Sequence, residues 1–61
     1  MSYTRYAEIR DERGVTDYQV AKETGIPKST FSDWKNNRSK PKVDKLQKIA
    51  EYLKVSILKL L

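Results

Sequence analysis

The sequence predicts an all-α domain of five short helices. Apolar residues recur at spacings of three and four, which is typical of helices that bury one face. Gly14, Gly25 and the prolines at positions 27 and 41 divide the 61 residues into short segments, as expected of helix ends. No segment carries a strand signal. Because the chain is short, we expect residues 1–61 to fold as one domain around one core.

The first helix is predicted over Tyr3 to Arg13, a segment that is rich in helix-forming residues and contains no Gly or Pro. Its inward face is thin, with Tyr6 and Ile9 as the clear members. Gly14 suits the left-handed residue that commonly ends a helix. A turn is therefore expected before the next segment.

The second helix is predicted from about Asp17 to Thr24. Thr16 is a favourable N-cap residue, and Gln19, three positions later, completes the pattern of a capping box. Val20 and Ala21 are expected to be buried. Since Ala21 is small, another helix can approach closely at this point.

A third short helix is predicted between Pro27 and the asparagines at positions 36 and 37. Gly25 ends the helix before it, and Ile26 is expected to enter the core from the turn. Phe31 and Trp34 lie three residues apart and share one face, so core packing is favoured over a stacking platform for single-stranded nucleic acid. At about 100° per residue, polar and basic side chains gather on the opposite face: Lys28, Ser29, Ser32, Asp33 and Asn36.

The clearest amphipathic helix runs from Val43 to Lys54. Its apolar residues lie within about 120° of arc: Val43, Leu46, Ile49, Ala50 and Leu53. Ser56 is then expected to cap a last short helix, Ile57 to Leu61.

Basic residues concentrate in one segment of the chain. From Lys35 to Lys48 there are six bases and one acid, so this segment carries the whole net charge of +5. The bases are Lys35, Arg38, Lys40, Lys42, Lys45 and Lys48, and the acid is Asp44. Such a stripe beside an outward-facing helix predicts a polyanionic partner, although a solvated basic face is the plainer alternative.

The composition excludes several function classes. The absence of Cys and His removes disulfides, thiolate metal sites and the commonest general base. The acidic residues are scattered and no Gly-rich phosphate loop is present, so we expect no enzyme, no metal, no cofactor and no small-molecule substrate. The chain has neither a signal core nor an apolar run of the ~18 residues that a membrane span needs. We therefore expect a cytoplasmic protein without a membrane partner.

Two short helices joined by a Gly-containing turn form the helix-turn-helix pattern, whose second helix enters the major groove of DNA. This pattern is preceded by a leading helix and followed by a basic loop (Arg38 to Lys42), a long amphipathic helix and a Val-Ser turn. The whole arrangement resembles the phage repressor and Cro family over essentially the whole chain. The resemblance rests on Val15-Thr16, Val20-Ala21, Gly25-Ile26, Ser29-Thr30, Ser32, Asn36, Pro41, Leu46, Ile49-Ala50 and Val55-Ser56. It implies a lambda-repressor-like fold that binds double-stranded DNA.

The resemblance also implies roles for individual residues. The start of the third helix is expected to meet base edges through Lys28, Ser29, Ser32 and Asp33. Asp33 has two alternatives, repulsion of a phosphate or pairing with a neighbouring Lys. Phosphate contacts are expected at the start of the second helix, past the third helix and on the first: Thr16, Asp17, Asn36, Arg38, Lys40, Lys42 and Arg5.

Three positions depart from the family pattern. Asn37 and Lys54 stand where Gly is expected, and left-handed geometry costs a Lys about 1 kcal/mol. Lys35 stands where related domains often carry a Glu that faces the Arg at position 10. Arg10 is then left to face solvent or to pair with Glu51 or Asp11.

The implied function is that of a transcriptional repressor that acts as a homodimer on a palindromic operator, with half-sites ~34 Å apart. An antitoxin-like or activator domain of the same fold is an alternative. A helical protein-interaction module is another, but it predicts apolar groups on the outer face of the third helix. Related repressors continue into a linker and an oligomerising domain. One interpretation is therefore that the chain is the N-terminal fragment of a longer repressor. The apolar end at Leu58, Leu60 and Leu61 equally suits pairing.

Overall fold

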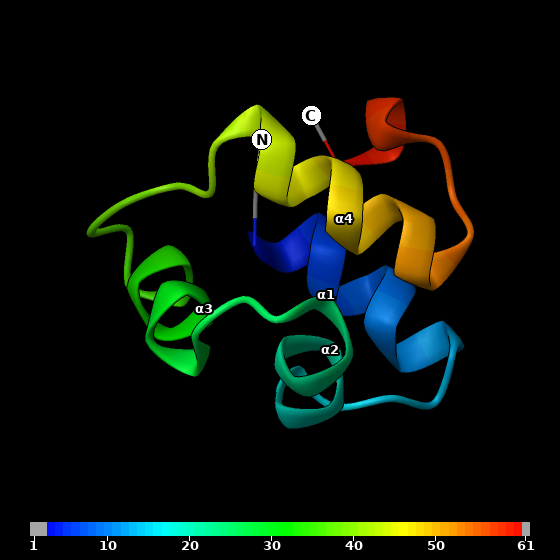
Figure 1. The fold of residues 1–61 in the computed structure, drawn as a ribbon, viewed down its shortest axis with the longest axis horizontal. Helices are drawn as coiled ribbons and strands as arrows, with labels where there is room; N and C mark the ends of the chain where they lie inside the picture. The colour runs from blue at the N-terminus through cyan, green and yellow to red at the C-terminus, as the bar shows by residue number, and fades with distance from the viewer. Residues whose placement is uncertain (1–2, 61) are drawn as a thin grey trace.

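A computed structural model describes residues 3–60, in which four α-helices are followed by a single 3₁₀ turn (Figure 1). The elements are α1 (Tyr3–Glu12), α2 (Asp17–Thr24), α3 (Lys28–Lys35), α4 (Val43–Leu53) and η1 (Ile57–Lys59). The four predicted α-helices are confirmed to within one residue at their ends. None of the helices in residues 3–60 is both long and apolar enough to cross a membrane.

The prediction of a fifth α-helix is wrong for the described residues. Ser56 does cap the last element, since its side chain accepts a hydrogen bond from the backbone N–H of Leu58 at 3.2 Å. The Leu60 N–H then donates to the Ile57 carbonyl, three residues back, which closes a 3₁₀ turn. Leu61, the predicted end of this helix, lies outside the described residues.

The predicted capping box at the start of α2 is present. The Thr16 hydroxyl accepts from the Gln19 N–H at 3.2 Å, and the Gln19 side chain accepts from the Thr16 N–H at 3.0 Å. Gly25 ends α2 in the left-handed conformation, with φ of 76°. The helix-turn-helix pair is therefore bounded by local signals that the sequence carries on its own.

The core forms where α4 and α1 cover the inner sides of α2 and α3, with contacts of α2 to both α3 and α4 (Figure 1). Ile26 enters it from the turn, and Phe31 and Trp34 are only 1% and 2% exposed. These outcomes confirm core packing for the two rings. The buried indole N–H of Trp34 has no acceptor among residues 3–60, so this side chain contributes packing rather than a hydrogen bond.

Two tyrosines of α1 hold the inner face of α3. The Tyr6 ring is stacked on Trp34, with centroids 5.0 Å apart, and also lies 5.5 Å from Phe31. The Tyr3 ring meets Trp34 edge-on at 5.7 Å. Aromatic pairs in such arrangements add about 0.5–1.5 kcal/mol beyond the area that they bury. The α1 helix thus compensates for its thin apolar face with two rings.

One predicted core residue is exposed. Val43 is 66% exposed, whereas the four other apolar residues of its helix are buried: Leu46, Ile49, Ala50 and Leu53. Val43 is the first residue of α4, so it lies a turn before the part of the helix that packs against the rest of the molecule. Periodicity identifies the correct face but does not locate the edge of the core.

The backbone predicts a stabilising substitution at the end of α4. Asn37 and Lys54 both have φ of 58°, in the left-handed region that favours Gly. Allowing for the extra backbone entropy that Gly loses on folding, Lys54→Gly should raise the free energy of unfolding by about 0.5–1 kcal/mol. Thermal unfolding should then shift upward by a few degrees. Asn37→Gly should give a smaller gain because Asn tolerates this geometry better, and a larger gain at Asn37 would contradict the argument.

Candidate nucleic-acid interface

The outward face of α3 is polar because its large side chains point inward. Lys28, Ser29 and Ser32 are exposed, and Asp33 is half-buried. Phe31 and Trp34 occupy the inner face of the same two turns. The face that is expected to meet base edges is therefore accessible to solvent. Aromatic packing of Phe31 and Trp34 on the opposite face fixes the helix to the core.

Asp33 is partnered by a basic residue, but by Arg38 and not by a Lys. An Arg38 guanidinium nitrogen lies 3.4 Å from an Asp33 carboxylate oxygen, and the Arg38 backbone N–H donates to the Asp33 carbonyl at 2.8 Å. The Arg38 side chain is 68% exposed, so the ion pair is weak and can be exchanged for another partner. This contact connects the third helix directly to the start of the basic loop.

The basic loop between α3 and α4 is anchored by its proline. Pro41 is buried, whereas Lys40 and Lys42 on either side of it are exposed. At the other end of the loop, the Asn36 side chain donates to the Ser32 carbonyl at 2.9 Å, which fixes it against α3. The flanking lysines are therefore displayed on a fixed backbone beside the third helix.

The start of α2 offers backbone donors, and the Asp17 carboxylate beside them already accepts from α1. The capping box uses the Thr16 hydroxyl and both the Thr16 and Gln19 N–H groups. The Asp17 carboxylate accepts hydrogen bonds from the Tyr3 hydroxyl at 2.6 Å, the Tyr6 hydroxyl at 2.8 Å and Arg10 at 2.8 Å. A phosphate at this end of α2 can be met by backbone N–H groups of the first turn and by the Thr16 hydroxyl hydrogen, and Lys35 lines a hollow beside them with Thr16 and Asp17.

Asp17, Tyr3, Tyr6 and Arg10 form a cluster, the Asp17 cluster, in which the charge of Arg10 balances that of Asp17. Burial alone would raise the pKa of Asp17, but the hydrogen bonds from Tyr3, Arg10 and Tyr6 and the Arg10 charge outweigh it and lower this pKa below its usual value. Burial and the Asp17 carboxylate raise the pKa of Tyr6. The hydrogen bond to Asp17 is the largest contribution that raises the pKa of Arg10. All members therefore keep their usual protonation states at neutral pH.

The partner of Arg10 differs in part from the prediction. Arg10 pairs with Asp17 at 2.8 Å and with Asp11 at 3.0 Å, and Glu51 is not involved. Asp11 was among the expected partners, whereas Asp17 and the Tyr3 hydroxyl, to which Arg10 donates at 2.9 Å, were missed. The available signal was an acid in the first turn of α2 together with tyrosines three residues apart on α1, which place two donors on one helix face.

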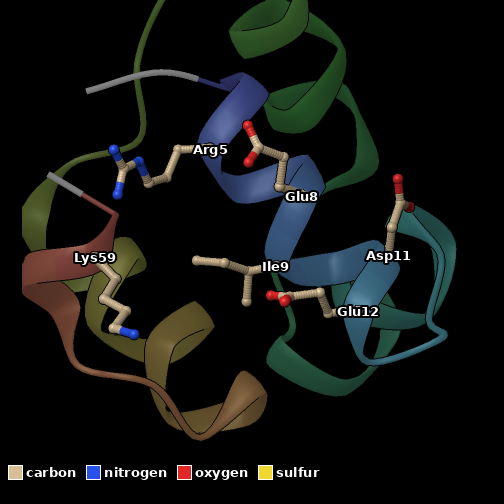
Figure 2. A pocket seen from close by; sticks show the side chains of 6 residues that line it. All are labelled: Arg5, Glu8, Ile9, Asp11, Glu12 and Lys59. Carbon is tan, nitrogen blue, oxygen red and sulfur yellow. The ribbon is translucent and has the colours of Figure 1, made fainter.

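Arg5 lies in a different environment from the other predicted phosphate contacts. It lines a hollow of about 650 Å³ between α1 and η1, together with Glu8, Ile9, Asp11, Glu12 and Lys59. Figure 2 shows Ile9 and Glu12 of α1 pointing toward the side of the hollow where Lys59 of η1 lies. The structure thus groups Arg5 with α1 and η1, not with the outer face of α3. Among residues 3–60, no group of three or more acidic side chains is arranged to hold a metal ion.

Acid should weaken the Asp17 cluster specifically. At neutral pH, Asp17→Asn should lower the free energy of unfolding by about 1.5–3 kcal/mol, since hydrogen bonds to a charged group are weakened. The folded-state pKa of Asp17 lies below its unfolded value of about 3.9, so the wild type has this stabilisation above that pH and loses it as the pH falls through the folded pKa. Unfolding by urea from about pH 7 to about pH 2 should show the two proteins converging at low pH.

Asp11→Asn is the matched control for this experiment, because Asp11 pairs with the same arginine but its side chain is 69% exposed. The change should cost less than about 1 kcal/mol. A gap between wild type and Asp17→Asn that does not change with pH would contradict the assigned role.

Comparison with known proteins agrees with this geometry. The family model described as "Helix-turn-helix" matches residues 7–60, which includes the whole of α2, α3 and α4. Neither a curated protein nor a solved structure matches the chain significantly. The matched family is a DNA-binding family without enzymatic activity. The chain belongs to the helix-turn-helix family of the phage repressor and Cro type, with the lambda-repressor-like fold that this family implies.

Proposed function

We propose that this DNA-binding domain is a sequence-specific transcriptional regulator of the repressor type, which binds a palindromic operator as a homodimer. The observation that carries the proposal is the division of α3 into a buried aromatic face and an exposed polar face, with the basic loop directly beside it. The α3 helix alone is nearly neutral, with Lys28 and Lys35 against Asp33. Discrimination between base sequences is therefore assigned to α3, and most of the affinity for DNA is assigned to the basic loop.

Base recognition is assigned to the exposed side chains at the start of α3. Lys28 suits the O6 and N7 acceptors of a guanine, and Ser29 and Ser32 can donate or accept at either base of a pair. Asp33 suits a cytosine amino group, provided that the weak pair with Arg38 opens on binding. Each such contact is worth about 1–3 kcal/mol of discrimination.

Phosphate binding is assigned mainly to the chain past α3. Arg38, Lys40 and Lys42 are exposed on the basic loop, and Asn36 is exposed at its start. The first turn of α2, after Thr16, would add backbone N–H donors from Asp17 onward, and Arg5 is a further candidate on α1. If about four to six phosphates are contacted by each subunit, the affinity will fall steeply with salt.

Pairing of two copies would place half-sites about one helical turn, ~34 Å, apart. Pairing would bury exposed apolar side chains on η1 and at the start of α4, where Val43 directly follows Lys42 of the basic loop. Leu58 on η1 is 75% exposed and Val43 on α4 is 66% exposed. Exposed apolar side chains of this size favour association between proteins when they lie together on a surface.

Duplex binding measured against salt tests this assignment. Lys40→Ala should weaken binding to all sequences and lower the magnitude of the salt slope by about one unit, because one phosphate contact is lost. Ser32→Ala should instead change which sequence is preferred and leave the slope unchanged. Lys59→Ala, which removes an exposed charge from η1, is the control and should change neither. Failure of the wild type to bind any duplex at ~50 mM salt and high micromolar protein would refute DNA binding.

A further inference from the structure

A second surface lies at the end of the molecule away from α3. The C-terminal end of α4 and the connection between α1 and α2 come together on the side opposite to α3 (Figure 1). They enclose a hollow of about 480 Å³, which is lined by Arg13, Val15, Tyr52, Leu53 and Lys54. We name this hollow the α1–α4 groove. Its size suits one or two side chains of a partner rather than a whole helix.

The floor of the α1–α4 groove is apolar and partly accessible. Leu53 is only 2% exposed and closes the groove from below. Val15 and Tyr52 are half-buried and pack against the core, so each still presents apolar surface to the groove. Tyr52 also lines the adjoining hollow with Thr24. The floor therefore offers an apolar side chain a place to be buried without any rearrangement of the core.

Two cations form the rim of this groove, and each is held there by the backbone. The Arg13 guanidinium donates through Nε to the Leu53 carbonyl at 2.9 Å, which fixes it over the end of α4. Lys54 follows at the C-cap in the left-handed conformation, with φ of 58°. Gly would be more stable at this position, so the chain keeps a cation at the rim in spite of backbone strain.

Within residues 3–60, no ion pair neutralises the charges of the rim. The ion pairs of residues 3–60 involve Arg10 with Asp11 and Asp17, and Arg38 with Asp33, so neither Arg13 nor Lys54 has a carboxylate partner. Nearby acids exist, since Glu51 lines the adjoining hollow, but its side chain accepts from Gln47 instead. The groove thus combines an apolar floor with two unneutralised positive charges.

We propose that the α1–α4 groove docks a short acidic segment of a partner protein, with an apolar side chain against Val15 and Tyr52 and carboxylates at Arg13 and Lys54. This occupant is favoured by charge complementarity, because a neutral or basic segment would leave both cations unpaired or repelled. Since the residues that line the groove do not include any of α3, the outer face of α3 stays exposed when the partner is bound. The inference goes beyond DNA binding and stands on the geometry of the groove alone. The small area predicts a weak, transient interaction.

A titration followed residue by residue with ¹⁵N NMR tests the proposal. The probe is a short peptide of alternating Asp and Leu, capped at both ends. Saturable shifts are expected at residues 13–15 and 52–54, with half-saturation below about 1 mM. The same peptide with Asn in place of Asp should not shift these residues. Shifts that occur only in the basic segment from Lys35 to Lys48, or no saturable shift at the groove, would overturn the proposal.

Lys54→Gly is the informative variant because it removes a rim charge and relieves backbone strain, so loss of folding cannot explain its effect. It should weaken peptide binding roughly two- to fivefold, which corresponds to one exposed ion pair. Arg13→Gln combined with Lys54→Gly should weaken it further. The matched control is Lys40→Ala, which should leave peptide binding at the groove unchanged.

Two other occupants give distinct outcomes. Shifts at the groove that depend on protein concentration without peptide would identify a second copy of the chain as the occupant and refute an acidic partner. If Lys54→Gly lowers the salt slope of duplex binding as much as Lys40→Ala does, the rim holds phosphates and the proposal fails. Unchanged duplex binding by Lys54→Gly together with weakened peptide binding supports it. Loss of duplex binding by the wild type would refute the DNA role and leave this test intact.

Discussion

The carboxylate of Asp17 is the contact on which the arrangement of the three N-terminal helices depends. It lies in the first turn of α2 and accepts from Tyr3, Tyr6 and Arg10 of α1. The rings of the same two tyrosines pack on Trp34 of α3. Each tyrosine therefore holds one helix through its hydroxyl and another through its ring, which is the dual use that a phenol allows. A domain of this size buries a smaller fraction of its surface than a larger one, so each contact that orients its helices matters more.

This bracing from α1 explains how α3 can present a polar surface. A short helix that exposes Lys28, Ser29 and Ser32 has little intrinsic stability and must be held by its other face. Trp34 and Phe31 supply that face, and the tyrosines of α1 supply what they pack against. Because Arg10 neutralises Asp17, the acid in the first turn of α2 does not oppose a phosphate there. The ion pair of Arg10 and Asp17 thus connects the packing of α1 with the start of α2, which is proposed to meet a phosphate.

Features that depend on near neighbours in the sequence could be predicted, whereas contacts between helices could not. The capping box at Thr16, the turn at Gly25 and the inward position of Trp34 follow from spacing and backbone preference, and all three are present. Spacing places the tyrosine donors on one face of α1, but the pairing of Arg10 with Asp17 also depends on how α1 crosses α2, which spacing does not give. Val43 fits the apolar arc and is still exposed, because the end of a helix need not be covered by the rest of the fold. For the candidate site, the exposed face of α3 was predicted from spacing, but the Asp33 pair with Arg38 depends on the path of the loop.

Left-handed residues occur at four turns of residues 3–60, and they are Gly at the first two and non-Gly at the last two. Gly25, between α2 and α3, has φ of 76°, and a Cβ there would meet nothing within 4 Å. A larger residue would thus be strained at this turn but not blocked, as the left-handed Asn37 and Lys54 show elsewhere in the same fold. The chain nevertheless has Gly at the turn that sets the angle between α2 and α3, and tolerates non-Gly residues at the two later turns. Strain at the α2–α3 turn would act directly on the helix that is proposed to read bases, whereas strain at Lys54 acts on an edge away from it. Gly therefore stands at the turns before α2 and before α3, and the orientation of α3 relative to α2 depends on the second of these.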